Sequence, residues 1–384
     1  MIETIVLLII VFCLALGLGI SFSNLIHVKR FDEYAQATDQ PFVSILVPAR
    51  NEERNIEACV RSLLAQNYRN FEVIVLNDQS TDSTGAILAR LARTEPCLRV
   101  INGAPLPEGW PGKHWACQQL SQAATGEYLL FTDADTRHEP HALTCAISAA
   151  QKEKADLVTA IPREEVLTWG EKVLVPFMTF GIISYLPLHL VQKFQFPALS
   201  VTIGQFMLFR ASAYHAVGGY EAACQNVNDD VLLGRTLIEK GYRWHILDGN
   251  GAVTCRMYHS FSEAVEGFSK NVFGFFDYCI LPFVFVFSAA AFVFLEPLRL
   301  TAFSLLNGGV NTLPGELAVI AVFEAFFLFL MAYHRMGIPL YMTFFYWLTI
   351  FLFFVVAMRS MVFSITGHAS WKGRTLKNVE VRWI

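Results

Sequence analysis

Charged side chains are scarce in this sequence of 384 residues. Asp, Glu, Lys and Arg make up 16% of the chain, against roughly 25% in an ordinary soluble domain, whereas hydrophobic residues make up 54%. The formal net charge of -4 lacks the basic excess that nucleic-acid binding requires, so we predict no nucleic-acid partner. This composition excludes a disordered chain, a disulfide-stapled mini-protein and a simple soluble enzyme.

Several common motifs are also missing. The eight cysteines form no CxxC pair and no Cys/His cluster with zinc spacing, which indicates small core residues in a reducing compartment. No GxGxxG follows a predicted strand, and Gly112-Lys113 lacks the earlier glycine and the following Ser/Thr of a P-loop. If the chain binds a nucleotide, we expect it to use carboxylates and a divalent metal.

Long uncharged runs lie at both ends of the chain. Residues 5–26 carry no charge and are long enough to cross a ~30 Å hydrocarbon core. The basic residues that follow predict a cytoplasmic end, and the N-terminus lacks the features of a cleaved signal peptide. Further candidates lie at 278–295, 317–333 and 336–358. We therefore predict a multi-pass protein of the cell (cytoplasmic) membrane.

The C-terminal segments contain a conflict. Three crossings would place the tail after Met358 outside the cytoplasm, yet this tail is basic and includes Lys372 and Arg382. Either the last segment is re-entrant or interfacial, or the number of crossings differs. Pro339 leaves room for a broken helix.

The middle of the chain alternates predicted strands and helices. Short apolar runs at 42–47, 71–76 and 128–131 predict buried strands, and helical spacing of apolar residues separates them. This alternation predicts an α/β domain with a mostly parallel sheet. In such a sheet, ligands bind at the carboxyl ends of the strands.

Acidic and polar residues follow three of these strands. Arg50 and Glu52 follow the first, Asp78 follows the second, and Asp133 and Asp135 follow the third. Because these strand ends should meet at one edge, we expect the side chains to converge. Two carboxylates that flank one residue suit Mg²⁺ or Mn²⁺; the alternative is a solvated loop with helix-capping acids.

Three other polar groups have both a functional and a structural interpretation. Asp229 and Asp230 open a predicted helix, where either could be a general base or only a partner of the helix dipole. Lys113 could hold a phosphate or only cap a loop. Spacing alone does not decide between these interpretations.

Together, these residues resemble family 2 of the inverting glycosyltransferases, which have a GT-A fold. The resemblance covers 42–271 and rests on VSILVPARNEE, VIVLNDQSTDST, FTDADT and NDDVLLGRTLIEKGYRW. Further stretches narrow it to membrane-bound members near the diaponeurosporenoate-type carotenoid glucosyltransferases and the hopanoid-associated transferases. These stretches are GWPGKHWACQQ, GQFMLFRASAYHAVGGY, GFSKN and SWKGR.

The resemblance implies a role for each matching position. Binding of a UDP-sugar is implied for Ala49, Arg50, Glu52, Asp78, Lys113 and Asp133. Asp133 and Asp135 match the metal pair for Mg²⁺ or Mn²⁺, with Asp135 the expected direct ligand. Asp230, beside Asp229, matches the catalytic base that takes a proton from an acceptor hydroxyl.

The resemblance implies transfer of one sugar from a UDP-sugar to a lipophilic acceptor in the bilayer. A processive polysaccharide synthase, or its accessory subunit, is the alternative, but Lys240 occupies the Gln position of the QxxRW motif that such synthases carry. A catalytically dead membrane scaffold is a third class, which the intact acidic motifs disfavour.

This interpretation gives a domain organisation. We predict an N-terminal transmembrane anchor (1–30), a linker (31–41), a cytoplasmic GT-A domain (42–271), C-terminal transmembrane helices (272–362) and a basic tail (363–384). Within the GT-A domain, the apolar stretch 172–196 is predicted to lie on the bilayer as an interfacial segment and admit the acceptor. A core helix pair is the alternative for this stretch.

Overall fold

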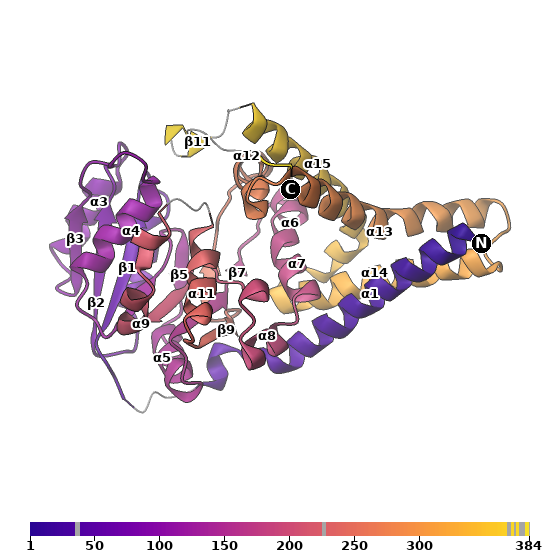
Figure 1. Ribbon diagram of the computed structural model, residues 1–384. Coiled ribbons are helices and arrows are strands. Elements are labelled where there is room, and N and C mark those ends of the chain that lie inside the picture. Colours follow the sequence, from indigo (N-terminus) through magenta and orange to yellow (C-terminus); the bar gives the residue numbers. More distant parts are fainter. Residues whose placement is uncertain (35–38, 225–227, 367–369, 372–373, 376–380, 384) are drawn as a thin grey trace. The chain divides into compact units, whose positions relative to one another are not determined.

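The computed structural model describes residues 1–34, 39–224, 228–366, 370–371, 374–375 and 381–383 (Figure 1). Lys372 of the predicted basic tail lies outside the described residues. The chain divides into an α/β unit, formed by Val28–Glu165 and Leu188–Met257, and a helical unit, formed by Met1–His27, Val166–Pro187 and Tyr258–Ile384. The range predicted for the GT-A domain therefore contains two stretches that group with the helices.

A seven-stranded sheet forms the centre of the α/β unit, in the order β3-β2-β1-β4-β8-β6-β9. Its strands are β1 (Val43–Ala49), β2 (Phe71–Asn77), β3 (Leu98–Asn102), β4 (Tyr128–Phe131), β6 (Leu157–Ile161), β8 (Met207–Arg210) and β9 (Trp244–Asp248). Only β8 runs antiparallel to its neighbours. The predicted mostly parallel sheet is confirmed.

A smaller sheet lies at one end of β4 and β6. It has the order β5-β10-β7, from β5 (Thr136–His138), β10 (Val253–Cys255) and β7 (Arg163–Glu164). Only four residues separate β4 from β5, and one residue separates β6 from β7. The small sheet therefore extends directly from the strand ends at which a ligand is expected.

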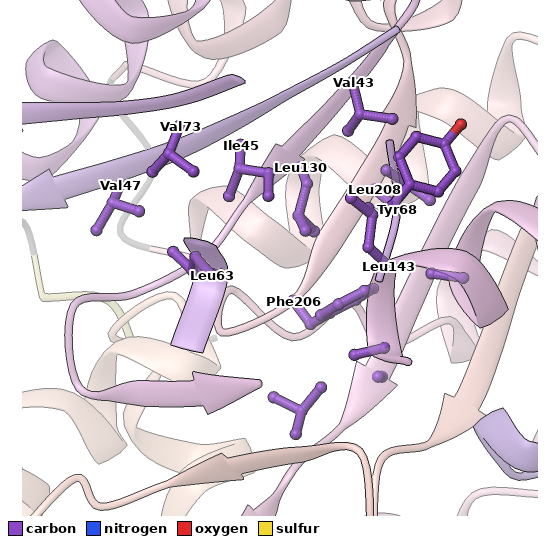
Figure 2. Close-up of a cluster of buried hydrophobic side chains, with 14 of the residues drawn as sticks. Val43, Ile45, Val47, Leu63, Tyr68, Val73, Leu130, Leu143, Phe206 and Leu208 are labelled. Carbon is purple, nitrogen blue, oxygen red and sulfur yellow. The ribbon is translucent and has the colours of Figure 1, made fainter. Parts of the chain in front are cut away.

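Helices cover the large sheet because alternate residues of its strands point to opposite faces. They are α2 (Ile56–Leu64), α3 (Thr84–Ala92), α4 (Gly112–Ala123), α5 (Ala142–Lys152), α8 (Leu188–Phe194), α9 (Ala211–Ala216), α10 (Gly219–Ala222) and α11 (Asp229–Glu239). Figure 2 shows one face of the sheet, where Val43, Ile45 and Val47 of β1 share a cluster with Leu63 of α2 and Leu143 of α5. All five side chains are fully buried or nearly so, as expected for a sheet with helices on both faces.

Within the described residues, the helical unit contains four helices that are long and apolar enough to cross a membrane. They are α1 (Ile2–His27), α13 (Ile280–Leu306), α14 (Leu313–Met336) and the stretch Leu340–Ile365, which comprises the 3₁₀ turn η4 (Leu340–Phe345) and α15 (Tyr346–Ile365). Shorter helices accompany them: α6 (Trp169–Leu174), α7 (Pro176–Tyr185) and α12 (Phe261–Asn271). Membrane-length helices at both ends of the chain are thus confirmed; α1, α13 and α14 lie side by side (Figure 1).

A buried polar contact joins the C-terminal ends of α1, α7 and α14. The Asn24 side-chain amide donates to the backbone carbonyls of Ile183, at 2.8 Å, and Leu186, at 2.7 Å. The Arg335 guanidinium donates to the Asn24 carbonyl at 2.9 Å. Both polar side chains are buried, so these bonds satisfy carbonyls that the ends of α1 and α7 would otherwise leave unpaired.

The course of α15 bears on the conflict over the basic tail. Tyr346, at its start, lies beside Phe294 in the middle of α13, and Ser360, near its end, accepts a hydrogen bond from the backbone N–H of Phe273, before α13 begins. Arg382 then pairs with the residues that flank the start of α13. Since α13 and α14 form an antiparallel pair, the end of α14 and the start of α13 lie toward the same side of the helical unit. Leu340–Ile365 begins just after α14 and ends near the start of α13, so both of its ends lie toward that side. This arrangement supports the re-entrant alternative.

The apolar stretch 172–196 divides between the two units. Its first part packs among the membrane-length helices, where Phe177 stacks on Phe353 and Phe180 stacks on Phe329, both with ring centroids 3.9 Å apart. Its last part, α8, belongs to the α/β unit and has an exposed Phe194. Contact between this stretch and lipid remains a prediction.

Candidate active site

The loops that follow β1 and β2 hold each other in place. The backbone N–H of Asp78 donates to the carbonyl of Ala49 at 2.8 Å. Arg50 Nη1 donates to the carbonyl of Asp78 at 2.6 Å and lies 3.9 Å from its carboxylate. Asn51 adopts a positive φ of 52°, which Asn tolerates better than most residues. Ala49, Arg50 and Asp78 therefore meet at the carboxyl edge of the sheet, as the sequence predicts.

Glu52 is fixed by the same pair of loops. Its backbone N–H donates to the Thr84 hydroxyl at 2.8 Å, and the Glu53 carboxylate accepts from the backbone of Ser83 at 3.0 Å. These bonds connect the start of α2 to the start of α3. The loops after the first two strands thus form one hydrogen-bonded polar surface, the polar wall.

Lys113 lies in the first turn of α4 and pairs with the acid at the end of β4. Its Nζ is 2.6 Å from Asp133 Oδ1. Burial by itself would lower the pKa of Lys113, but attraction to the carboxylates of Asp133 and Asp229 outweighs burial and raises the pKa well above its ordinary value. Lys113 is therefore a permanent cation of the site, and one oxygen of Asp133 is already engaged.

Asp230 lies in the first turn of α11 and faces Lys113 across Gly204. The backbone N–H groups of Gly204 and Val231 donate to the two oxygens of Asp230, at 3.0 and 2.7 Å. A Cβ built on Gly204 would lie 3.3 Å from Asp230 Oδ2 and 3.5 Å from Lys113 Nζ. The structure thus brings Asp230, Lys113 and Asp133 into one site, with Gly204 leaving the space between them.

The two neighbouring acids of α11 titrate differently. Burial, and then the charge of Asp229, raise the pKa of Asp230 to about 7, although Lys113 opposes this shift. Burial also disfavours ionised Asp229, but its hydrogen bond and charge interaction with His114 and the charge of Lys113 lower its pKa overall. A pair of carboxyl groups whose pKa values are driven apart is the pattern expected of an acid/base site.

His114 holds Asp229 from α4. Its Nε2 lies 3.4 Å from Asp229 Oδ1, and its ring packs beside Tyr220. Both His114 and Asp229 are buried. Sequence reasoning missed His114 and Gly204, although both lie in or beside stretches that carried the resemblance, because neither has a motif of its own.

Asp135 lies where the small sheet begins. Its backbone carbonyl accepts from the N–H of Arg256 at 3.2 Å. Thr136 of β5 is the register partner of a buried thiol, Cys255 of β10. Cys255 is in turn the register partner of a buried acid, Glu164 of β7. Burial, and then the charge of Asp135, raise the pKa of Glu164 to about 8. Glu164 was not predicted, because a short Glu-Glu pair in the sequence carries no signal for a buried position.

The chemistry of these groups fits a divalent cation held together with substrate oxygens. Among the described residues, no three His, Cys, Asp or Glu side chains converge on a point that could hold a metal ion. Mg²⁺, however, is often held by one or two carboxylates together with phosphate oxygens. Asp135 supplies hard oxygen donors, and Glu164 has one buried oxygen, Oε2, without a hydrogen-bond partner in the described part of the chain.

A family comparison identifies the class of the α/β part of the chain. Residues 44–218 match the family model "Glycosyl transferase family 2". The chain therefore carries a family 2 glycosyltransferase domain with a GT-A fold and membrane-length helices at both ends, as the sequence predicts.

The comparisons with individual proteins narrow this class. The chain is similar to the 4,4'-diaponeurosporenoate glycosyltransferase of Staphylococcus haemolyticus, with 27% identity over 264 residues that cover 67% of this chain and 68% of that protein. It is also similar to the beta-monoglucosyldiacylglycerol synthase of Nostoc sp., with 30% identity over 198 residues, 50% of this chain and 40% of that protein. The match thus spans less than half of the Nostoc enzyme.

A solved structure supports the fold. It is the mannosyltransferase PcManGT from Pyrobaculum calidifontis in complex with GDP-Man and Mn²⁺, with a TM-score of 0.51 and 15% identity. The likeness covers 92% of this chain and 99% of that chain. At this identity, the likeness concerns the fold alone.

Proposed function

We propose that this protein transfers a single sugar from a UDP-sugar to a lipid acceptor, with inversion at the anomeric carbon, at the cytoplasmic face of the membrane. The observation that carries this proposal is the meeting of Asp230, Lys113 and Asp133 at the carboxyl edge of the sheet. The names of the two relatives specify a carotenoid acid and a diacylglycerol glycolipid, which supports a lipophilic acceptor.

The donor would lie along the polar wall formed by the first two strand ends. Ala49, Arg50, Glu52 and Asp78 would hold the uridine, because they offer backbone groups, a guanidinium and carboxylates in fixed positions. Lys113 would bind the diphosphate as a permanent cation. A Mg²⁺ or Mn²⁺ ion held by the Asp133–Asp135 motif would supply further positive charge for the leaving UDP.

Asp230 would be the general base. Its pKa of about 7 leaves a substantial fraction of the carboxylate ionised at neutral pH, and it remains basic enough to accept the proton of an acceptor hydroxyl. The N–H groups of Gly204 and Val231 fix both of its oxygens. Asp229, held by His114, would raise the basicity of Asp230 through its charge.

The acceptor would approach from the membrane. α8 carries exposed apolar side chains, Leu190 and Phe194, beside Lys193, whose ammonium lies 5.4 Å from the Phe194 ring centroid. Aromatic and aliphatic groups next to a lysine are typical of segments that lie in a bilayer interface. This surface supports entry of a lipid.

The test is substitution of Asp230 by Asn in the full-length protein, with Glu239→Gln as the matched control. Glu239 is an exposed acid of the same helix. UDP binding would be measured by calorimetry, and transfer would be measured with radiolabelled UDP-glucose, UDP-galactose and UDP-N-acetylglucosamine into bacterial lipid extracts. We expect Asp230→Asn to keep UDP binding but lose about 10²–10⁴-fold in transfer rate.

Near-normal transfer by Asp230→Asn would reject this residue as the base. Mass spectrometry of the product distinguishes the alternatives, because a processive synthase yields a ladder of sugars and the proposed enzyme adds one. A β-linkage in the product from the α-linked donor, observed by NMR, would support inversion.

A further inference from the structure

Glu164 is a buried acid next to the predicted metal pair. It occupies β7 and is 8% exposed. No basic side chain of the described residues forms an ion pair with it, and its Oε2 accepts no hydrogen bond there. Gln205 hydrogen-bonds the side chain, but a buried carboxyl group with no basic partner and one unpaired oxygen is still costly, so its retention at this position requires an explanation.

The small sheet places Glu164 beside Cys255, which in turn contacts Asp135. Cys255 of β10 is the register partner of Glu164 on one side and of Thr136 on the other. Directly paired residues of a sheet point to the same face, so Glu164, Cys255 and Thr136 share one face, and Asp135, in the turn before β5, is linked to this face by its contact with Cys255. The charges of Asp135 and Glu164 both act on the Cys255 thiol, which also hydrogen-bonds Asp135.

Asp133, the other acid of the motif, is committed to a different partner. Its Oδ1 lies 2.6 Å from Lys113 Nζ. A cation that bound symmetrically between Asp133 and Asp135 would have to compete with this ammonium group. Glu164 has an unpaired oxygen, Oε2, and lies in β7 next to Cys255, which contacts Asp135.

We propose that Glu164 supplies the second protein carboxylate for the divalent cation bound at Asp135, while Asp133 mainly fixes Lys113. This inference rests on the proposed metal-dependent transfer from a nucleotide sugar. It assigns a residue outside the Asp-x-Asp motif to the cation, and it explains why an acid is buried in β7.

The experiment measures Mn²⁺ binding to the full-length protein in detergent by electron paramagnetic resonance, with and without UDP. Glu164→Gln keeps the size of the side chain and removes its charge. Glu165→Gln is the matched control, because Glu165 is the next residue, is partly exposed and lies 3.8 Å from Arg137. We expect Glu164→Gln to raise the Kd for Mn²⁺ at least tenfold and Glu165→Gln to leave it unchanged.

Equal Mn²⁺ affinity in Glu164→Gln and Glu165→Gln would overturn the inference and leave the proposed function intact. Absence of Mn²⁺ binding by the unaltered protein, even with UDP, would overturn the metal-dependent part of the proposed function and this inference with it. If Glu164→Gln fails to fold, as judged by thermal unfolding, Glu164→Asp replaces it. That variant keeps the charge but shortens the reach, and undiminished Mn²⁺ affinity in it would contradict direct ligation.

Discussion

Substitution of Asp229 by Asn should shift the pH dependence of transfer toward lower pH. Asp229 is the second-largest cause, after burial, of the raised pKa of Asp230. Its replacement removes a negative charge while an amide oxygen can still face His114. A neighbouring like charge commonly changes a carboxyl pKa by about 1 unit or more, so we expect the pKa of Asp230 to fall from about 7 by about 1 unit.

The direction of this pH shift follows from the role of Asp230 as a base, because a base is active only when it has lost its proton. At pH 6, a base with a pKa of 7 is roughly 9% ionised and one with a pKa of 6 is roughly 50% ionised. The ratio of the single-turnover transfer rate at pH 6 to that at pH 8 should therefore rise roughly fivefold in Asp229→Asn. Use of this ratio cancels any pH-independent loss of activity that the substitution causes.

The control is again Glu239→Gln, which should leave the ratio unchanged because this acid is exposed at the far end of α11. Lys113 opposes the charge of Asp229 at the same carboxyl group, so Lys113→Met should move the acidic limb to higher pH. An unchanged ratio in Asp229→Asn, with transfer still measurable, would refute either the electrostatic coupling of the two acids or the role of Asp230.

Three other substitutions test the packing around the site and in the helical unit. Gly204→Ala should reduce the transfer rate about tenfold or more with UDP binding retained, since the added Cβ would lie 3.3 Å from Asp230 and near-attack geometry is sensitive to small displacements. Transfer assays and calorimetry measure the two quantities, and an unimpaired rate would show that the carboxylate can move aside without loss of activity. Asn24→Ala should lower the free energy of unfolding by about 1–3 kcal/mol, because one buried and one partly buried carbonyl lose their donor. Thermal unfolding in detergent measures this loss against Gly19→Ala, a position with open space, and equal melting temperatures would contradict the argument. Phe180→Ala should lower the free energy of unfolding by about 3–5 kcal/mol in the same assay, because its buried ring is stacked inside the helical unit. A loss below about 1 kcal/mol would mean that the helices move together and fill the cavity.

The strand ends were predictable because they depend on local patterns. A buried strand is short, apolar and followed by polar residues, so the positions of Arg50, Asp78 and Asp133 follow from the sequence alone. Parallel pairing then brings the carboxyl ends of β1, β2 and β4 to one edge, whatever the details of packing. The edge of the sheet at which these residues meet therefore follows from the sequence alone.

The partners of these residues were not predictable in the same way. His114 reaches Asp229, and Glu164 reaches the neighbourhood of Asp135, only through contacts between elements far apart in the sequence. No local periodicity encodes the register of a three-residue strand such as β10. The ion pair of Asp133 with Lys113 likewise depends on where α4 places the lysine.

The membrane part shows the same contrast. Hydropathy determined that the ends of the chain contain membrane-length helices, because crossing a bilayer requires about 20 apolar residues. Hydropathy could not determine the direction of the last one, since an apolar helix has the same composition whether it crosses or returns. The contacts of Tyr346 with α13 and of Arg382 with the start of the same helix favour a return, and only the tertiary structure contains them.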